Sequence, residues 1–290
     1  MVAKAALLLL LVASVYAMGC RTRPTESQQP TSTGLLATAT LAPTPTPLDV
    51  SAYPLGTVGY AISWPQCGGP YPGEPFEFGI IGVTNGEAFT RNPCFADEYR
   101  WARRGRYHPS IYMNTNYDER REPSVAMQAC GVDASCRAYQ YGRAMAEDAY
   151  EYAASVHGVA PVWWLDVQIV SVWSEDFARN AESIRGATEL LRSKGIRVGI
   201  SSTSFQWATV AGPALHNMPI WDASALDAAM AATFCAEGKD FGGGRTEQIA
   251  YVEQFETVVA CGAVAVTPLP SQPRETALRG RAAPTPRWRW

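Results

Sequence analysis

The 290-residue sequence is poor in the residues that build metal sites and nucleic-acid surfaces. It has only three histidines, which are scattered, and no Cys-x-x-Cys pair, so we expect no metal and no other cofactor. Its formal net charge of −3 argues against a nucleic-acid partner. Long apolar runs are scarce too: the N-terminal run at 5–16 is too short to cross a bilayer comfortably as a helix. The chemistry must therefore come from carboxyl, amide and aromatic side chains.

The N-terminus is typical of an export signal. Lys4 precedes the apolar run and small residues follow it, which predicts a signal peptide at 1–19. The end of this segment, Ala-Met-Gly-Cys at 17–20, resembles a bacterial lipobox and predicts lipidation of Cys20. The protein would then be anchored to the cell membrane and face outward. Ordinary cleavage nearby would instead give a freely secreted protein.

The composition divides the rest of the chain into three parts. Residues 20–51 are rich in Thr and Pro and predict a disordered tether, which reaches on the order of 90 Å at about 3.1 Å per residue. Residues 52–264 form the folded domain. Residues 265–290 form a disordered basic tail that ends in Arg-Trp-Arg-Trp. The tail either touches anionic wall polymer or membrane, or has no selected role.

Six cysteines remain besides Cys20, and an even number in an exported chain suggests disulfides. Fifteen pairings are possible. We favour nearest neighbours, because each bond then staples a local loop. The expected pairs are Cys67 with Cys94, Cys130 with Cys136, and Cys235 with Cys261.

Strand-like and helical runs alternate through the folded part. Expected strands lie at 58–63, 78–84, 110–114, 162–168, 196–201, 219–223 and 248–255, and expected helices at 95–104, 133–156 and 174–195. Such alternation predicts a parallel sheet with right-handed crossovers. The sequence predicts that this sheet closes into a (β/α)8 TIM-like barrel, regular or irregular, with local disulfides. A doubly wound open sheet is the alternative. We expect a monomer.

The central stretch is the apolar run that ends at Asp166. It reads as a buried parallel strand that brings Asp166 to the carboxyl end of the sheet. Side chains two apart on a strand share a face, so Asp166 and Gln168 should point the same way. Asp222 and Glu253 lie on later expected strands and could reach the same end. These three carboxylates, Asp166, Asp222 and Glu253, are the candidate catalytic residues.

Polar and aromatic side chains gather at the same predicted strand ends. Sugar rings favour such surroundings, because their apolar faces stack on indoles while amides and carboxylates bind the hydroxyls. The alternative is that most of the tryptophans pack in the core. The candidate glycan-binding residues are Trp64, Asn85, Asn114, Asn116, Trp164, Gln168, Trp221 and Gln254.

Several motifs together resemble a group of exported bacterial glycoside-hydrolase-like domains. They are Gly-Tyr-Ala-Ile-Ser-Trp-Pro-Gln-Cys at 59–67, the segments 78–86, 88–90 and 92–94, Tyr-Met-Asn-Thr-Asn at 112–116, and Trp-Trp-Leu-Asp-Val at 163–167. This group is similar to glycoside hydrolase family 25, the Chalaropsis-type lysozymes, over most of 57–261. The resemblance implies a barrel, a peptidoglycan-like substrate cut at the N-acetylmuramic acid linkage, and catalytic acids at the ends of the first and fourth strands.

The sequence departs from the family pattern at both acid positions. Ala61 stands where the first-strand pattern Gly-x-Asp-(Val/Ile)-Ser has Asp, and Gln168 stands where the fourth-strand pattern Asp-x-Glu has its general acid. Only Asp166 remains. An ordinary glycosidase needs two carboxyl groups, so three interpretations stay open. The chain is a pseudoenzyme that binds wall glycan, an active glycosidase with relocated carboxylates, or a surface domain without a glycan ligand.

Overall fold

The computed structural model describes residues 53–262 except 214, 216, 240 and 242–243. Eight strands close into a barrel in chain order. They are β1 (Val58–Ile62), β2 (Phe78–Gly82), β3 (Ser110–Asn114), β4 (Val162–Asp166), β5 (Arg197–Ser202), β6 (Ile220–Asp222), β7 (Thr246–Val252) and β8 (Glu256–Ala260). The fold is therefore a TIM-like barrel, and the open-sheet alternative is wrong.

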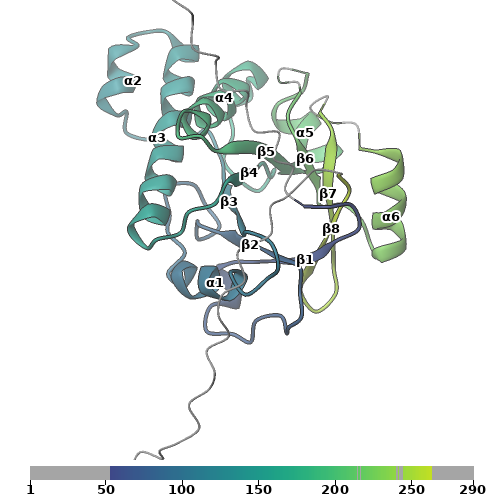
Figure 1. Cartoon of the computed structure of the whole chain (residues 1–290). Helices are drawn as coiled ribbons and strands as arrows, with labels where there is room; N and C mark the ends of the chain where they lie inside the picture. Colours follow the sequence, from purple (N-terminus) through teal and green to yellow (C-terminus); the bar gives the residue numbers. More distant parts are fainter. Residues whose placement is uncertain (1–52, 214, 216, 240, 242–243, 263–290) are drawn as a thin grey trace, which may run out of the picture. The chain divides into compact units, whose positions relative to one another are not determined.

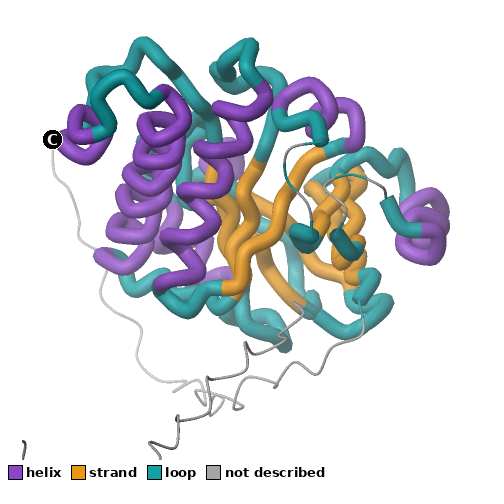
Figure 2. The backbone as a smooth tube through the Cα atoms, turned by 90° about the horizontal axis from the view of Figure 1, so that it is seen from above, coloured by secondary structure: helices purple, strands orange, loops and turns teal. Residues whose placement is uncertain are grey.

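Helices lie outside the ring of strands, as Figures 1 and 2 show. They are α1 (Phe95–Ala102), α2 (Val125–Ala129), α3 (Ala134–Ser155), α4 (Phe177–Ser193), α5 (Ser204–Val210) and α6 (Ala228–Glu237). A single turn of 3₁₀ helix, η1 (Trp64–Gln66), follows β1. Among the described residues, no helix is long and apolar enough to cross a bilayer. The predicted signal peptide, the lipidated Cys20, the tether and the tail all lie outside the described residues.

The last strand corrects the sequence prediction. The segment 248–255 was expected to be one strand, but β7 ends at Val252 and a short turn leads into β8. Strand β8 runs antiparallel to both β7 and β1, whereas the other neighbouring strands are parallel. The turn carries no Gly or Asn-Gly signal, and Phe255 continues the apolar pattern, so the sequence hides the break. As a result, β8 begins at the end of the barrel where the parallel strands finish.

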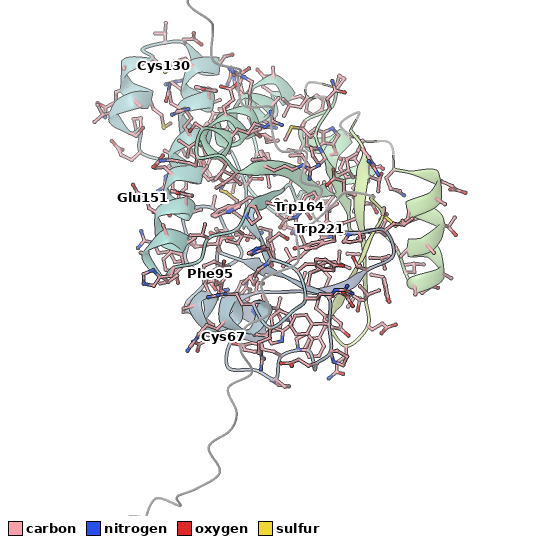
Figure 3. All side chains as sticks on the ribbon, in the orientation of Figure 1. Cys67, Phe95, Cys130, Glu151, Trp164 and Trp221 are labelled. Carbon is pink, nitrogen blue, oxygen red and sulfur yellow. A yellow bond between two sulfur atoms is a disulfide. The ribbon has the colours of Figure 1, made fainter. Side chains whose placement is uncertain are left out.

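Alternation along β4 separates two apolar cores. Trp163 and Leu165 pack in the layer between the strands and the helices. Val162 and Trp164 belong to a second cluster inside the barrel, together with Trp221 of β6. Figure 3 shows Trp164 and Trp221 within the ring of strands. Their rings pack edge to face, with 5.9 Å between the ring centroids. The same alternation directs Asp166 into the barrel.

Helix ends follow local capping chemistry. The Asp133 carboxylate accepts a hydrogen bond from the Cys136 amide at 3.0 Å and caps the start of α3. Asp176 is the N-cap of α4 and accepts from the Ala178 amide at 2.9 Å, so this helix begins later than the expected range 174–195. Gly195, with φ of +78°, follows the end of α4 and allows the chain to turn into β5.

The three disulfides join the expected nearest neighbours. Cys67 pairs with Cys94, Cys130 with Cys136, and Cys235 with Cys261. The first bond ties the loop after β1 to the start of α1, the second joins α2 to α3, and the third joins α6 to the end of β8. Each bond therefore closes a local loop of an otherwise short-looped barrel.

Glycines allow α3 and α4 to pack closely. A Cβ added to Gly142 on α3 would lie 1.8 Å from the Ser183 carbonyl oxygen on α4, and one added to Gly186 would lie 2.0 Å from the Tyr139 carbonyl oxygen. Backbone atoms cannot move aside as a flexible side chain can. The two helices therefore need Gly at both positions.

We expect Gly142→Ala to lower the free energy of unfolding by about 1 to 3 kcal/mol, because the clash forces the helices apart. Alanine in an unobstructed helix would instead stabilise by about 1 kcal/mol. Urea unfolding of the disulfide-bonded protein measures the difference. A gain in stability would contradict the close contact between these helices.

Candidate functional site

Asp166 lies at the carboxyl end of β4 and is held by two amide groups. The β3–β4 register places Asn114 beside it, and Asn114 Nδ2 donates to Asp166 Oδ2 at 2.8 Å. Gln168 Nε2 donates to the same oxygen at 2.8 Å, so Asp166 and Gln168 point the same way, as predicted, and are also in direct contact. The Thr84 hydroxyl donates to Asn114 Oδ1 at 2.7 Å. This bond fixes the Asn114 amide so that its NH₂ faces the carboxylate.

Burial dominates the electrostatics of Asp166. The side chain is only 5% exposed, and this burial raises the pKa of Asp166 from 3.8 to about 7. The hydrogen bonds from Gln168 and Asn114 favour the ionised form and lower the pKa, but by less. Near neutral pH, the carboxyl group is therefore close to the balance between its acid and its carboxylate.

A second carboxyl group, Glu256, lies at the same end of the barrel. Glu256 begins β8 and pairs directly with Ala61 on β1. It shares a face with Val258, which packs inside the barrel. Burial, and then the charge of Asp166, raises the pKa of Glu256 to about 7. The two carboxyl groups therefore interact, and Glu256 lies opposite the position where the family pattern would have its first-strand acid.

The phenol of Tyr112 also feels both carboxyl groups. Burial raises the pKa of Tyr112, and the charges of Glu256 and Asp166 raise it further. The ring of Tyr112 on β3 points into the barrel and packs edge-on against the ring of Trp221, with 6.0 Å between the ring centroids. Tyr112 and Trp221 thus lie within the barrel close to the carboxyl pair.

Sequence reasoning missed Glu256 because it did not recognise β8. The available signal was alternation: Glu256, Val258 and Ala260 are two apart and share the inner face. The expected strand at 248–255 ended directly before Glu256, so the residues that follow were not recognised as a strand of their own. Without the antiparallel return, nothing in the sequence places Glu256 next to Ala61.

The structure does not bring the other two candidate acids to Asp166. Asp222 follows the inward-facing Trp221, so it points to the outer layer, where its Oδ1 accepts from the Ser224 amide at 2.9 Å. Glu253 lies exposed in the β7–β8 turn, and Gln254 is exposed beside it. Both turn residues are on the rim of the barrel.

The predicted glycan-binding residues separate by depth. Trp164 and Trp221 are 0% and 2% exposed, so they form the floor beneath the carboxyl groups and do not wall a cleft. Asn116 turns to the helical layer, where it accepts from the Tyr141 hydroxyl at 2.6 Å. Trp64 is 43% exposed and Asn85 is exposed, so they remain accessible to a ligand. Asn114 and Gln168 bind Asp166 directly.

A raised pKa alone does not mark the site. Glu98 on α1 is also buried, and burial raises its pKa to about 7. Its Oε2 accepts from Asn92 Nδ2 at 2.6 Å, and Asn92 Nδ2 also donates to the Gly82 carbonyl. Glu98 thus supports the packing of α1 on β2 outside the barrel. Position inside the barrel distinguishes Asp166 and Glu256 from it.

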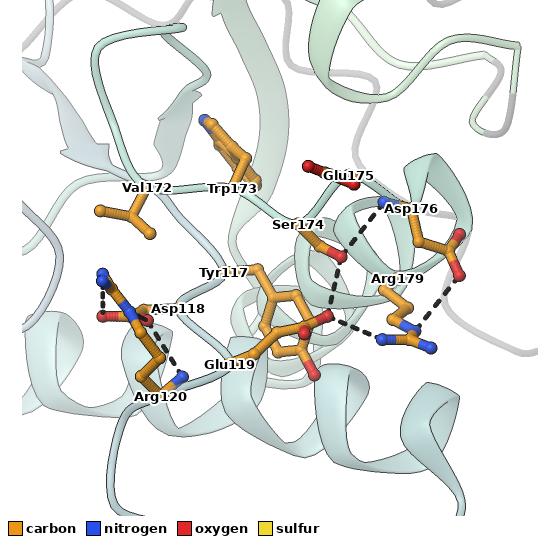
Figure 4. A pocket seen from close by; sticks show the side chains of 10 residues that line it. All are labelled: Tyr117, Asp118, Glu119, Arg120, Val172, Trp173, Ser174, Glu175, Asp176 and Arg179. Carbon is orange, nitrogen blue, oxygen red and sulfur yellow. Dashed lines mark hydrogen bonds and ion pairs between the residues drawn. The ribbon is translucent and has the colours of Figure 1, made fainter.

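A cavity of about 510 Å³ lies between the loops that follow β3 and β4. Trp173 connects the cavity to the carboxyl site, because its Nε1 donates to the Gln168 carbonyl oxygen at 2.8 Å. Figure 4 shows the ten lining residues: Tyr117, Asp118, Glu119, Arg120, Val172, Trp173, Ser174, Glu175, Asp176 and Arg179. Within the described part of the chain, no cluster of His, Cys, Asp and Glu is arranged to hold a metal ion.

Neither a scan of protein-family models nor a search of curated proteins gave a match. Among solved structures, the chain is similar to the modular Cpl-1 endolysin complexed with a peptidoglycan analogue, at 13% identity and a TM-score of 0.45, over 72% of this chain and 55% of that one. It is also similar to the modular autolysin LytC from Streptococcus pneumoniae, at 12% identity and a TM-score of 0.45, over 71% of this chain and 46% of that one. A third similar structure is the spore cortex lytic enzyme SleM from Clostridium perfringens, at 13% identity and a TM-score of 0.44, over 72% of this chain and 68% of that one.

This chain spans about half the length of the first two of these proteins. At these identities and scores, function has to be inferred from the chain's own residues.

Proposed function

We propose that this barrel is a glycoside hydrolase that cuts a peptidoglycan-type glycan, with Asp166 and Glu256 as its two carboxyl groups. One observation carries the proposal: two interacting carboxyl groups lie inside the same end of the barrel, each with its pKa raised to about 7. Hydrolysis of a glycosidic bond needs one protonated and one ionised carboxyl group. Such a pair titrates as a unit and holds about one proton near neutral pH.

The surroundings assign a role to each group. Asp166 Oδ2 accepts hydrogen bonds from the Asn114 and Gln168 amides, which stabilise its ionised form. Glu256 is more exposed than Asp166. Glu256 is therefore the general acid that protonates the leaving oxygen, and Asp166 is the carboxylate that activates water or stabilises the positive charge that develops on the sugar.

The substrate class is supported by the accessible rim and by the sequence motifs. The exposed indole of Trp64 suits the apolar face of a sugar, and the amides of Asn85 and Gln168 suit its hydroxyl groups. The motifs shared with exported glycoside-hydrolase-like domains favour a cell-wall glycan. Export by the signal at 1–19, with Cys20 as a lipid anchor or with free secretion, would bring the barrel to that glycan as a monomer.

Binding without cleavage is the second candidate function. It is favoured by Gln168, because an amide replaces the general acid that the family pattern has at this position and cannot transfer a proton. The same amide is hydrogen-bonded to Asp166, which is only 5% exposed. In that case, the barrel holds wall glycan and its carboxyl pair has only a structural role.

A paired assay on the full chain with its disulfides formed separates the two functions. It measures co-sedimentation with insoluble peptidoglycan and release of reducing ends from the same material. Release that is lost in Asp166→Asn supports the hydrolase. Binding without release, with release gained in Gln168→Glu, supports the binding function. Absence of both binding and release would contradict both and leave a surface role without glycan.

A further inference from the structure

The cavity between the loops that follow β3 and β4 has more negative than positive charge. Four carboxylates and two guanidinium groups line it: Asp118, Glu119, Glu175, Asp176, Arg120 and Arg179. Both cations are already paired within the cavity, Arg179 with Glu119 at 2.8 Å and Arg120 with Asp118 at 2.9 Å. Glu175 forms no ion pair with any residue that the structure describes. The lining therefore keeps a formal surplus of two negative charges, four minus two.

Aromatic and apolar surface lies next to this charge. The Nε1–H of Trp173 is bound to the Gln168 carbonyl, which fixes the indole, and Val172 is 43% exposed. Figure 4 shows Val172 and Trp173 side by side in the upper part of the view, with Glu175 next to Trp173 and the other charged groups below and to the right. An indole held in this way favours stacking with aromatic rings and with guanidinium groups. The cavity thus suits a ligand that is both cationic and aromatic.

The chain itself contains a segment of this chemistry. Residues 287–290 read Arg-Trp-Arg-Trp, and the stretch 263–290 holds five arginines and one glutamate, a formal surplus of four positive charges. Residue 287 follows Gly262, the last described residue, by 25 positions (287 − 262). At about 3.1 Å per residue these positions reach roughly 75 Å. A barrel strand of five to seven residues is only about 16 to 24 Å long, so the segment reaches the far end of the barrel with length to spare.

We propose that residues 287–290 bind in this cavity of the same chain, with their guanidinium groups against its carboxylates and an indole against Trp173. Tethering makes even a weak contact effective, because a linker of this kind gives an effective concentration of about 1 mM. A segment with a Kd of about 1 mM is then bound half of the time. Docking does not depend on the glycan function.

Amide hydrogen exchange in the full chain tests the docking directly. Exchange in the loops 115–123 and 167–176 is compared between the full chain and a chain that ends at Pro286. We expect exchange in these loops to become about twofold faster or more without the segment, and a synthetic peptide of residues 286–290 at millimolar concentration to slow it again. The pair Arg287→Glu with Arg289→Glu should have the same effect as the truncation.

Two controls separate docking from a general effect of charge. The pair Arg279→Glu with Arg281→Glu changes the net charge equally and should leave the two loops unchanged. Glu175→Lys should abolish protection by the segment, whereas Glu151→Lys on the exposed side of α3 should not. Equal exchange in the full and the shortened chains overturns the proposal, as does an equal effect of the 279/281 pair. Protection that grows with protein concentration also overturns it, because the segment of a second copy would then fill the cavity.

Discussion

Glu256→Gln is expected to lower the rate of glycan hydrolysis by about 10² to 10⁴-fold, because an amide cannot transfer the proton that the leaving oxygen needs. Binding to insoluble glycan should change little, since Gln keeps the size and most of the hydrogen-bonding capacity of Glu. The pH profile should change as well. The native pair, with both pKa values raised to about 7, gives a bell centred near neutral pH, and the variant loses one limb.

Glu253→Gln is the matched control for this prediction. Glu253 lies three residues earlier in the exposed β7–β8 turn, so its removal should change the rate by less than about twofold, as is usual for a group that does not take part in proton transfer. Initial rates of reducing-end release across pH 4–9 measure both variants. A native rate of hydrolysis in Glu256→Gln would contradict the assignment of Glu256 as the general acid. A large loss of rate in Glu253→Gln would make Glu253 a candidate acid again.

Asp166→Asn is expected to abolish hydrolysis and to stabilise the fold above neutral pH. The pKa of Asp166 rises from 3.8 to about 7 on folding, so at intermediate pH the native state holds a proton that the unfolded chain has lost. Stability from this group is therefore full below about pH 4 and is lost as pH rises through 7. Ionising the buried group costs on the order of 4 kcal/mol at most, because each pKa unit corresponds to about 1.4 kcal/mol.

Asn avoids this cost while its Oδ1 still accepts from the amides of Asn114 and Gln168. We therefore expect the variant to be about 1 to 4 kcal/mol more stable than the native protein at pH 8, and nearly equal to it at pH 4. Urea unfolding with the disulfides intact, at pH 4, 6 and 8, measures this difference. Glu151→Gln on the exposed side of α3 is the control and should leave the pH dependence unchanged. Parallel pH curves for Asp166→Asn and the native chain would contradict the buried titration.

A substitution that abolishes activity and raises stability, as expected for Asp166→Asn, is typical of a functional site. A buried carboxyl group that lowers stability at neutral pH persists where its chemistry is used. Asp166 fits this description, because burial raises its pKa against the effect of two hydrogen bonds. Glu98 is the contrasting case: it is buried too, but its partner Asn92 links it to the packing of α1 on β2.

Local patterns in the sequence were enough for much of the fold. The alternation of strand-like and helical runs predicted a barrel, and the apolar run ending at Asp166 predicted a buried strand with its carboxylate at the carboxyl end. The i, i+2 rule predicted that Asp166 and Gln168 point the same way. The preference for bonds that close local loops predicted the three disulfide pairs. Each of these features depends on residues that are close in sequence or on a periodicity of the backbone.

Long-range pairing decided the rest. The antiparallel return of β8 places Glu256 opposite Ala61, nearly 200 positions earlier in the chain, and no local pattern contains that register. The inward direction of Trp221 turns Asp222 away from the site, and barrel closure buries Trp164 and Trp221 as a floor. The sequence by itself determined that Asp166 stands at the mouth of a barrel. Only the tertiary structure supplied its carboxyl partner, because closure of the barrel buries both groups, which raises both pKa values, and brings Glu256 within the influence of the Asp166 charge.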